Sequence, residues 1–256
     1  MLIGVTEQMF YTVIFFLFGL LFGSFFNVVG LRVPKGESIA FPGSHCTVCN
    51  RDLKWYELVP VLSYICLLGK CRTCKTKISP LYPIMELITG ISFAFTCYVF
   101  GLTLTTVFVM LIVSMMVIIT VSDITTQLIP NKILLAFSIV LIPLALYIKN
   151  VTWQGALIGF AAAFGINLFI LLISKGKGMG GGDIKLFLLL GTILGWKAFL
   201  TLFFVSVIIG VFVGLGFKIK KGAKEFPFGP SIALGTIITV FYGNAIINWY
   251  LGLLSL

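Results

Sequence analysis

The stretch Gly178-Met-Gly-Gly-Gly-Asp183-Ile-Lys185 separates two long apolar runs of a 256-residue chain. It is polar and rich in glycine, and Asp183 stands where the next apolar helix is expected to begin. The chain has only eight acidic residues. A carboxylate in or at the end of a membrane helix is costly and therefore usually functional. The apolar runs around this stretch decide the fold, and Asp183 marks a first candidate site.

The composition is that of a polytopic membrane protein. Hydrophobic residues make up 59% of the chain, charged residues 10%, and the mean hydropathy is +1.14. A membrane-spanning helix needs about 20 residues. Apolar runs of this kind predict an all-α polytopic membrane protein, a bundle of about eight transmembrane helices, at 9–30, 80–100, 103–122, 130–148, 153–173, 184–196, 198–217 and 228–254. The first run lacks the basic flank of a signal peptide, so we expect a permanent helix.

The distribution of basic residues predicts the orientation. Eight alternating spans place 16 of the 18 Lys and Arg residues on one side and leave Lys149 and Lys197 on the other. By the positive-inside rule, the basic side is cytoplasmic. We expect three parts: a first transmembrane helix at 1–30, a cytoplasmic domain at 31–79 and a seven-helix bundle at 80–256. The net charge of +10 then reflects membrane topology, and we expect no nucleic-acid partner.

Four of the six cysteines form two CxxC pairs in the polar segment, Cys46-Thr-Val-Cys49 and Cys71-Arg-Thr-Cys74. This spacing is typical of a four-thiolate zinc site, which has no open position and is structural. A reducing cytoplasm disfavours disulfides. The alternative is a reduced or redox-active quartet without metal. Cys66 and Cys97 fall outside the pattern and are interpreted as small apolar side chains.

A second carboxylate, Asp123, closes an earlier apolar run in Val121-Ser-Asp123. In the predicted topology Asp123 ends the third span and Asp183 begins the sixth, on the same side. Two nearby carboxylates can share one proton, so that one acts as base and the other as acid. We therefore predict Asp123 and Asp183 as the catalytic pair of an aspartic protease. The helix dipole favours the anion at Asp183 and the neutral acid at Asp123.

The glycines before Asp183 suit a substrate-binding loop. Gly180, Gly181 and Gly182 have no side chains, so a substrate backbone can approach the acid closely. Three alternatives stay open: a glycine-rich loop with a helix-capping Asp, a proton-coupled transporter that uses the two acids as a relay, and a membrane scaffold that recruits a partner through the cysteine domain.

Two further patterns concern helix packing. Glycines spaced four apart allow close helix approach, and we interpret them as ordinary packing: Gly19/Gly23, Gly155/Gly159, Gly191/Gly195 and Gly210/Gly214. Asn27 lies within an apolar run and needs a hydrogen-bond partner, because an unpaired amide in hydrocarbon is costly.

The sequence resembles the bacterial type IV prepilin peptidases, GxGD-type intramembrane aspartic proteases. The resemblance covers nearly the whole chain. It rests on Gly180-Gly-Gly-Asp183, on Asp123 followed by Ile129-Pro-Asn131, on the tetracysteine segment, and on Phe22-Gly-Ser-Phe-Phe-Asn-Val-Val, Arg32-Val-Pro34 and Tyr82-Pro-Ile-Met-Glu86. After Trp55-Tyr56 this chain has Glu57-Leu58, where many members have Asp-Asn.

The resemblance implies a bifunctional enzyme of the bacterial inner membrane. Its members cleave prepilin or pseudopilin precursors after a glycine at the cytoplasmic face and then N-methylate the new N-terminus with S-adenosylmethionine. Glu86 and Gly90 lie in the region that the family associates with methylation; Glu86 paired with a loop lysine is the alternative. The sequence predicts neither an oligomeric state nor a methyl-donor site.

Overall fold

The computed structural model describes residues 2–176, 178–221 and 226–254, with side chains for 7–176, 178–216 and 226–253. The chain divides into two units, Met1–Thr125 and Thr126–Leu256, and each is described by itself. Some lysines in the charge count lie outside the described side chains: Lys177, Lys218, Lys220, Lys221 and Lys224.

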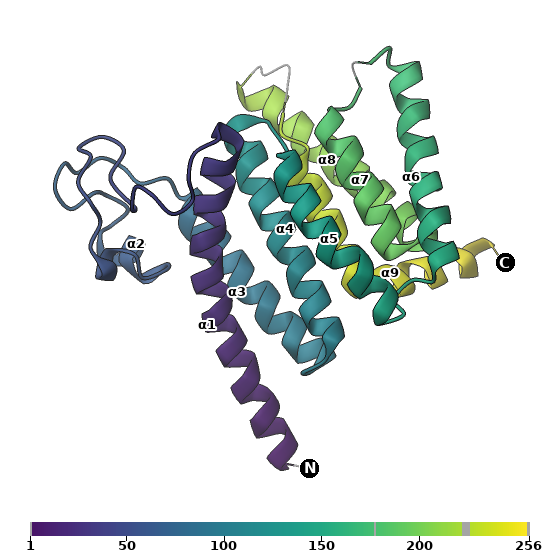
Figure 1. The fold of residues 1–256 in the computed structure, drawn as a ribbon, viewed down its shortest axis with the longest axis horizontal. Helices are drawn as coiled ribbons and strands as arrows, with labels where there is room; N and C mark the ends of the chain where they lie inside the picture. The colour runs from purple at the N-terminus through teal and green to yellow at the C-terminus, as the bar shows by residue number, and fades with distance from the viewer. Residues whose placement is uncertain (1, 177, 222–225, 255–256) are drawn as a thin grey trace. The chain divides into compact units, whose positions relative to one another are not determined.

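The first unit consists of three long helices and a loop-rich cysteine domain (Figure 1). Its helices are α1 (Leu2–Arg32), α3 (Leu81–Phe100) and α4 (Leu104–Thr126), the last of which ends at the unit boundary. Between α1 and α3 the chain forms two 3₁₀ turns, η1 (Val33–Lys35) and η2 (Trp55–Glu57), and the short helix α2 (Leu62–Cys66). The cysteine domain is thus inserted between two paired membrane helices.

Glycines bring α1 and α3 into backbone contact. A Cβ added to Gly19 would lie 2.7 Å from the Cα of Gly90, and one added to Gly23 would lie 2.8 Å from the Cα of Glu86. Real Cβ atoms do not approach so closely, so these positions require glycine. The predicted packing role of the first glycine pair is confirmed.

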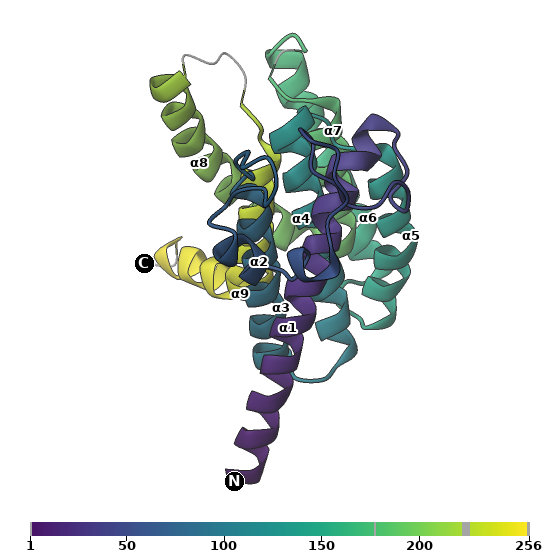
Figure 2. The ribbon, with the colours of Figure 1, turned by 90° about the vertical axis from the view of Figure 1, so that its left-hand side faces the viewer.

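The second unit contains five helices. They are α5 (Asn131–Tyr147), α6 (Trp153–Ile173), α7 (Gly181–Leu194), α8 (Trp196–Lys221) and α9 (Gly229–Leu254). Helix α7 lies against α5, α6 and α8, while α8 and α9 form a further pair (Figures 1 and 2). Figure 2 shows α8 and α9 as adjacent ribbons. The short helix α7 is therefore the centre of this unit.

The other predicted glycine pairs also contribute to packing. Gly159 of α6 and Gly191 of α7 face each other, so that a Cβ on either would meet the other's carbonyl oxygen. Gly210 and Gly214 of α8 leave room for the rings of Phe228 and Phe226. These contacts let α7 and α8 approach their neighbours at backbone distance, as small residues do between membrane helices.

All eight predicted apolar runs are helices. Six of them are long and apolar enough to cross a membrane: α1, α3, α4, α6, α8 and α9. Helix α5 has 17 residues and α7 has 14. At 1.5 Å per residue α7 is about 21 Å long, less than the hydrocarbon thickness of roughly 30 Å. The chain is an all-helical multi-pass membrane protein among its described residues. Helix α5 is slightly shorter than the predicted run 130–148, and α7 is short, as the predicted run 184–196 already indicated.

Candidate functional site

The four predicted metal-binding cysteines come together in the first unit. Their sulfur atoms all lie within 4.8 Å of one another, and Cys46 Sγ is 3.6 Å from Cys74 Sγ. Four ligands at about 2.3 Å in a tetrahedron would place their sulfurs about 3.8 Å apart. All six cysteines are free of disulfides. The donor set and its spacing therefore fit one zinc ion.

The two CxxC turns have the same backbone structure. In the first, the Cys46 N–H donates to Arg51 O (2.9 Å) and the Asn50 N–H donates to Cys46 O (2.9 Å). In the second, 25 residues later, the Cys71 N–H donates to Thr76 O (2.8 Å) and the Lys75 N–H donates to Cys71 O (3.0 Å). Each turn therefore presents two thiols from one side of a tight loop.

Each turn contains one left-handed residue that is not glycine. Asn50 has φ 52° and Lys75 has φ 57°, and each directly follows the second cysteine of its pair. Near the second turn, the Thr76 hydroxyl lies 3.4 Å from Cys74 Sγ. Hydrogen bonding to Thr76 lowers the pKa of Cys74 to about 6. This environment favours the thiolate, the form that binds metal.

An ion pair stabilises the loop behind the first turn. Arg51 binds Glu57 through two hydrogen bonds, Nη2 to Oε1 at 2.8 Å and Nη1 to Oε2 at 3.0 Å, and the Lys54 N–H donates to Oε2 at 2.9 Å. The Glu57 side chain is 2% exposed. Hydrogen bonding to Arg51, then to the Lys54 backbone, lowers the pKa of Glu57 to about 2. Glu57 therefore has a structural partner within its own domain.

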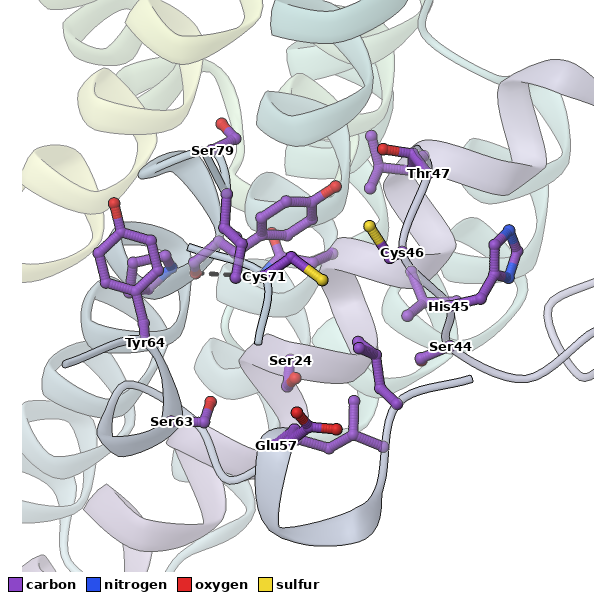
Figure 3. Close-up of a pocket in the computed structure, with 18 of the residues that line it drawn as sticks. Ser24, Ser44, His45, Cys46, Thr47, Glu57, Ser63, Tyr64, Cys71 and Ser79 are labelled. Carbon is purple, nitrogen blue, oxygen red and sulfur yellow. Dashed lines mark hydrogen bonds between the residues drawn. The ribbon is translucent and has the colours of Figure 1, made fainter. Parts of the chain in front are cut away.

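A cavity of about 450 Å³ lies between the cysteine domain and the helices α1 and α3. Its walls include the loop residues Cys46, Glu57 and Cys71, which point toward a common space with Ser24 of α1 (Figure 3). Its helix wall includes Asn27 and Glu86. The cavity thus combines apolar helix surface with polar and charged groups, which is typical of a small-molecule site.

Glu86 joins the cysteine domain to α3. Its Oε2 accepts a hydrogen bond from the Val61 N–H at 2.7 Å, and the residue is 7% exposed. The pairing of Glu86 with a loop lysine, one alternative from the sequence, is absent from the described ion pairs. Gly90 lies one turn further along α3, against Leu20 and Phe16 of α1, and does not line the cavity.

Asn27 has the hydrogen-bond partner that its place in an apolar run requires, at the start of α3. Its Nδ2 donates to Tyr82 O at 3.1 Å. Its Oδ1 is buried and has no hydrogen-bond partner among the described residues. Asn27 is 2% exposed and lines the cavity. One end of this amide therefore holds two helices together, while the other retains an acceptor.

Asp183 lies in the first turn of α7, as expected for an acid at a helix start. Gly180 is the N-cap residue, and a Cβ added there would lie 3.0 Å from Asp183 Oδ2. A Cβ added to Gly181 would meet no atom within 4 Å. Free N–H groups at a helix start favour a negative charge nearby. Gly180 is thus adjacent to the carboxylate, and Gly181 borders open space.

The segment Ile129-Pro-Asn131 supports the start of α7. A Cβ added to Gly182 would lie 2.8 Å from the Cβ of Ile129. Asn131, the first residue of α5, accepts a hydrogen bond from Lys185 Nζ at 2.9 Å. These two contacts hold the glycine loop against the loop that follows α4.

Asp123 lies in the last turn of α4, which continues to Thr126. It is 6% exposed. Asp123 belongs to the first unit and Asp183 to the second. The four cysteines are brought together, Glu86 and Asn27 line the same cavity, and the glycine loop contacts Ile129.

Sequence reasoning did not predict the cavity or the two polar links around it. Arg51 and Glu57 have opposite charges and lie six residues apart in the sequence, so their ion pair had a local charge signal. The Val61–Glu86 bond involves a backbone donor, which no sequence pattern indicates.

Two family models match the chain. The bacterial Peptidase A24 N-terminal domain matches residues 17–100, and the type IV leader peptidase family matches residues 110–215. The chain is 40% identical to the prepilin leader peptidase/N-methyltransferase of Bacillus subtilis (strain 168), over 93% of this chain and 97% of the relative. Proteins of the same name from Neisseria gonorrhoeae and Legionella pneumophila are 31% and 30% identical, over 91% and 92% of this chain and 92% and 93% of the relatives. No solved structure matches the chain.

Proposed function

We propose that this chain, which belongs to the type IV leader peptidase family, cleaves the leader from prepilin-like precursors and N-methylates the new N-terminus. The observation that carries the proposal is the 40% identity to a prepilin leader peptidase/N-methyltransferase across 93% of the chain. The comparisons give no support to the transporter alternative. The relatives' name joins a peptidase and an N-methyltransferase, and we assign both activities to this one polypeptide.

Asp123 and Asp183 are the proposed catalytic pair. One carboxylate removes a proton from water as the water oxygen bonds to the scissile carbonyl carbon, and the other gives its proton to the carbonyl oxygen. The carbon–nitrogen bond then breaks as the amine gains a proton. The position of Asp183 in the first turn of α7 supports its role as the ionised member. This mechanism requires the two carboxylates to reach one water in the working enzyme.

Gly180, Gly181 and Gly182 form the proposed substrate loop. The open space beside Gly181 supports the approach of an extended peptide. Gly182 is required for a different reason, because its neighbour Ile129 leaves no room for a side chain. The loop therefore combines one glycine for the substrate with one for packing.

S-adenosylmethionine is the proposed methyl donor; its sulfonium-bound methyl group is transferred to the substrate amine. When bound, it would supply the methyl group to the amine nitrogen, with the carbon–sulfur electron pair left on sulfur and the amine proton released to water. Glu86 lines the cavity of the first unit, and this position supports a role for Glu86 in the methyl transfer. We propose an indirect role for Gly90, which lets α1 and α3 pack closely.

Zinc bound by Cys46, Cys49, Cys71 and Cys74 is the proposed structural metal. Four thiolates close the coordination shell, so the ion would stabilise the domain without binding substrate. The precursor is the proposed partner, and the cytoplasmic face of the inner membrane is the proposed site of action. The charge distribution supports this orientation, with 16 of 18 basic residues on one side in the eight-span topology.

Co-expression with a type IV prepilin tests the proposal. Mass spectrometry of the pilin N-terminus is expected to show leader removal and one added methyl group with the wild-type chain. Asp123→Asn and Asp183→Asn are expected to leave the leader uncut. Asp52→Asn is the matched control, since it changes the only other aspartate, an exposed one. Normal cleavage by both Asp123→Asn and Asp183→Asn would overturn the catalytic assignment.

A further inference from the structure

The segment of the cysteine domain that contains α2 exposes large apolar side chains. From Leu58 to Gly69 the chain has no charged residue. A run of about 10–14 apolar residues is too short to span a membrane and is typical of a buried core helix or of a segment at the membrane interface. Core burial does not account for this run, because Leu62 is 62% exposed, Ile65 59% and Leu68 83%. The segment therefore presents side chains that a water-soluble domain would bury.

The two sides of α2 are reversed relative to a helix on the surface of a water-soluble domain. Ser63 and Tyr64, which carry hydroxyl groups, line the cavity toward α1 and α3 (Figure 3). Leu62, Ile65 and Cys66 are exposed, at the spacing of three and four residues that places side chains on one face of a helix. A polar inner side and an apolar outer side suit a helix whose outer surroundings are hydrocarbon.

The depth of α2 follows from its link to α3. Helix α3 has 20 residues, about the number that a membrane span needs, so Leu81 lies at the membrane boundary. Glu86 lies about 7 Å further along α3, at 1.5 Å per residue. The Val61 N–H donates to the Glu86 carboxylate at 2.7 Å, and α2 begins at the next residue. Helix α2 is therefore level with the first turns of α3.

Helix α1 gives the same depth. A Cβ added to Gly23 would lie 2.8 Å from the Cα of Glu86, and Gly23 precedes the end of α1 at Arg32 by about 13 Å. Figures 1 and 2 both draw α2 beside the pair of α1 and α3, below the upper end of α1. Phe25 of α1 and Leu87 of α3, which flank the Gly23 contact, are exposed apolar side chains as well. The outer side of α2 thus lies at the level of membrane-helix surface.

We propose that α2 inserts its outer face into the lipid leaflet at this end of α1 and α3. This lipid face consists of Leu62, Ile65, Cys66 and Leu68. Interfacial helices bury their apolar side about 5–10 Å into the boundary between headgroups and acyl chains, which agrees with the depth of Glu86 in α3. One side of α2 then closes the cavity and the other contacts lipid. The cysteine domain is a membrane-inserted domain and does not extend freely from the ends of its two helices.

The residues next to the lipid face suit lipid headgroups. Trp55 is 79% exposed on η2, which lies against α2, and tryptophan is enriched at membrane–water interfaces. Glu57, the acid next to the uncharged run, is already paired with Arg51. The nearest exposed charges on either side of the run are Lys54 and Lys70. Lysines near a membrane surface attract anionic lipids, so the occupant we assign is a leaflet that contains them.

A nitroxide spin label on Cys66 tests the lipid face by electron paramagnetic resonance. The full-length, zinc-loaded chain is placed in nanodiscs of phosphatidylethanolamine and phosphatidylglycerol, one copy to a disc. Collisions of the label with oxygen, which concentrates in lipid, are compared with collisions with a water-soluble nickel chelate. We expect oxygen collisions to dominate at Cys66. Cys66→Ser is the blank, since it shows any labelling of the other thiols.

Two control positions in the Cys66→Ser chain calibrate the ratio of oxygen to nickel collisions. Phe18→Cys places the label at an exposed position in the middle of α1 and gives the ratio for lipid. Glu37→Cys places it at an exposed position beyond the end of α1 and gives the ratio for water. The ratio at Cys66 is expected to lie close to that of Phe18→Cys. A ratio like that of Glu37→Cys would overturn the proposal.

Labelling of the wild type with a lipid-soluble diazirine, activated by light, needs no variant. Mass spectrometry is expected to find the label on residues 62–68, as on α1 and α3, and not on the polar turn at residues 71–77. Absence of label from residues 62–68 would contradict lipid contact. Few collisions of the Cys66 spin label with either reagent would also overturn the proposal, because they would show that protein, such as a second copy, covers this face.

Discussion

The Val61 N–H donates a 2.7 Å hydrogen bond to Glu86 Oε2, joining the cysteine domain to helix α3. Val61 has φ 61° and ψ −51°, a conformation that a β-branched residue rarely adopts. Such backbone strain costs roughly 1–3 kcal/mol and persists where the surroundings compensate for it. The buried Glu86 carboxylate is the compensating partner, so these two residues determine how the domain is held on its helix.

A substitution of Glu86 that removes the carboxylate acceptor of the Val61 N–H should loosen the attachment of the cysteine domain to α3. Glu86→Leu leaves the Val61 N–H without its partner, at a cost of about 1–3 kcal/mol. We expect faster tryptic cleavage at Arg51, Lys54 and Lys70 in detergent, measured by mass spectrometry. Glu86→Gln keeps an acceptor oxygen and should resemble the wild type. Equal cleavage rates in Glu86→Leu and Glu86→Gln would show that this bond does not hold the domain.

Zinc binding should depend on four of the six cysteines. Cys46→Ser and Cys71→Ser each remove one ligand from the cluster, and we expect the purified variants to lose the metal, measured by inductively coupled plasma mass spectrometry at one zinc per wild-type chain. Cys66→Ser and Cys97→Ser are the matched controls, because these thiols lie outside the cluster. A full zinc content in Cys46→Ser or Cys71→Ser would contradict the site.

The sequence predicted the helices well because apolar runs of about 20 residues are a strong and local signal. It placed the ends less well. Helix α4 continues three residues past Asp123, and the Thr125 hydroxyl bonds back to Val121 O. Helix α7 begins at Gly181 instead of residue 184, because the glycines themselves form its first turn.

The site was predictable only where its chemistry is local in sequence. The CxxC spacing predicted the sulfur cluster, because each turn supplies two thiols by itself. The contact between Gly182 and Ile129 joins residues 53 apart and depends on how α5 and α7 pack. The cavity depends on the path of the whole loop between α1 and α3, which no periodic pattern encodes.

The ion pair of Glu57 should make the cysteine domain sensitive to acid. Its pKa is lowered from 4.5 to about 2 in the folded protein, so the pair stabilises the fold above pH 4.5. That stability should be lost as the pH falls from 4.5 toward 2, because the unfolded state binds the proton more readily. Hydrogen exchange measured by mass spectrometry on peptides from residues 46–57 should show increasing exposure over this window, after correction for intrinsic rates.

Glu57→Gln is the control for this pH dependence. The neutral amide cannot titrate, so the variant should exchange faster than the wild type at pH 5 and should approach it at pH 3. Loss of zinc in acid would affect the wild type and Glu57→Gln alike. The difference between their exchange rates therefore reports the contribution of the Glu57 carboxylate. If the difference in exchange rate between the wild type and Glu57→Gln stays constant from pH 5 to pH 3, titration of Glu57 is not the cause of the acid sensitivity.

The contact between Gly182 and Ile129 should control the peptidase loop. Gly182→Ala places a methyl group against the Ile129 side chain, which must shift or push the start of α7 away. We expect a 10- to 100-fold loss of leader cleavage in a co-expression assay, because a displacement of about 1 Å at a reacting group costs rates of this order. Ile129→Ala in the same chain makes room for the methyl group and should restore much of the activity. Coupling energies between touching residues are about 0.5–3 kcal/mol.

Gly181→Ala separates packing from substrate clearance. A Cβ at this position meets no atom of the chain within 4 Å, so the variant should be as thermally stable as the wild type. If the peptide passes beside Gly181, the methyl group should raise KM for the precursor, and Ile129→Ala should not restore it. Rescue of Gly181→Ala by Ile129→Ala, or failure to rescue Gly182→Ala, would contradict the division of roles. The two glycines differ in their neighbours, so the same substitution is expected to act through the fold at Gly182 and through the substrate at Gly181.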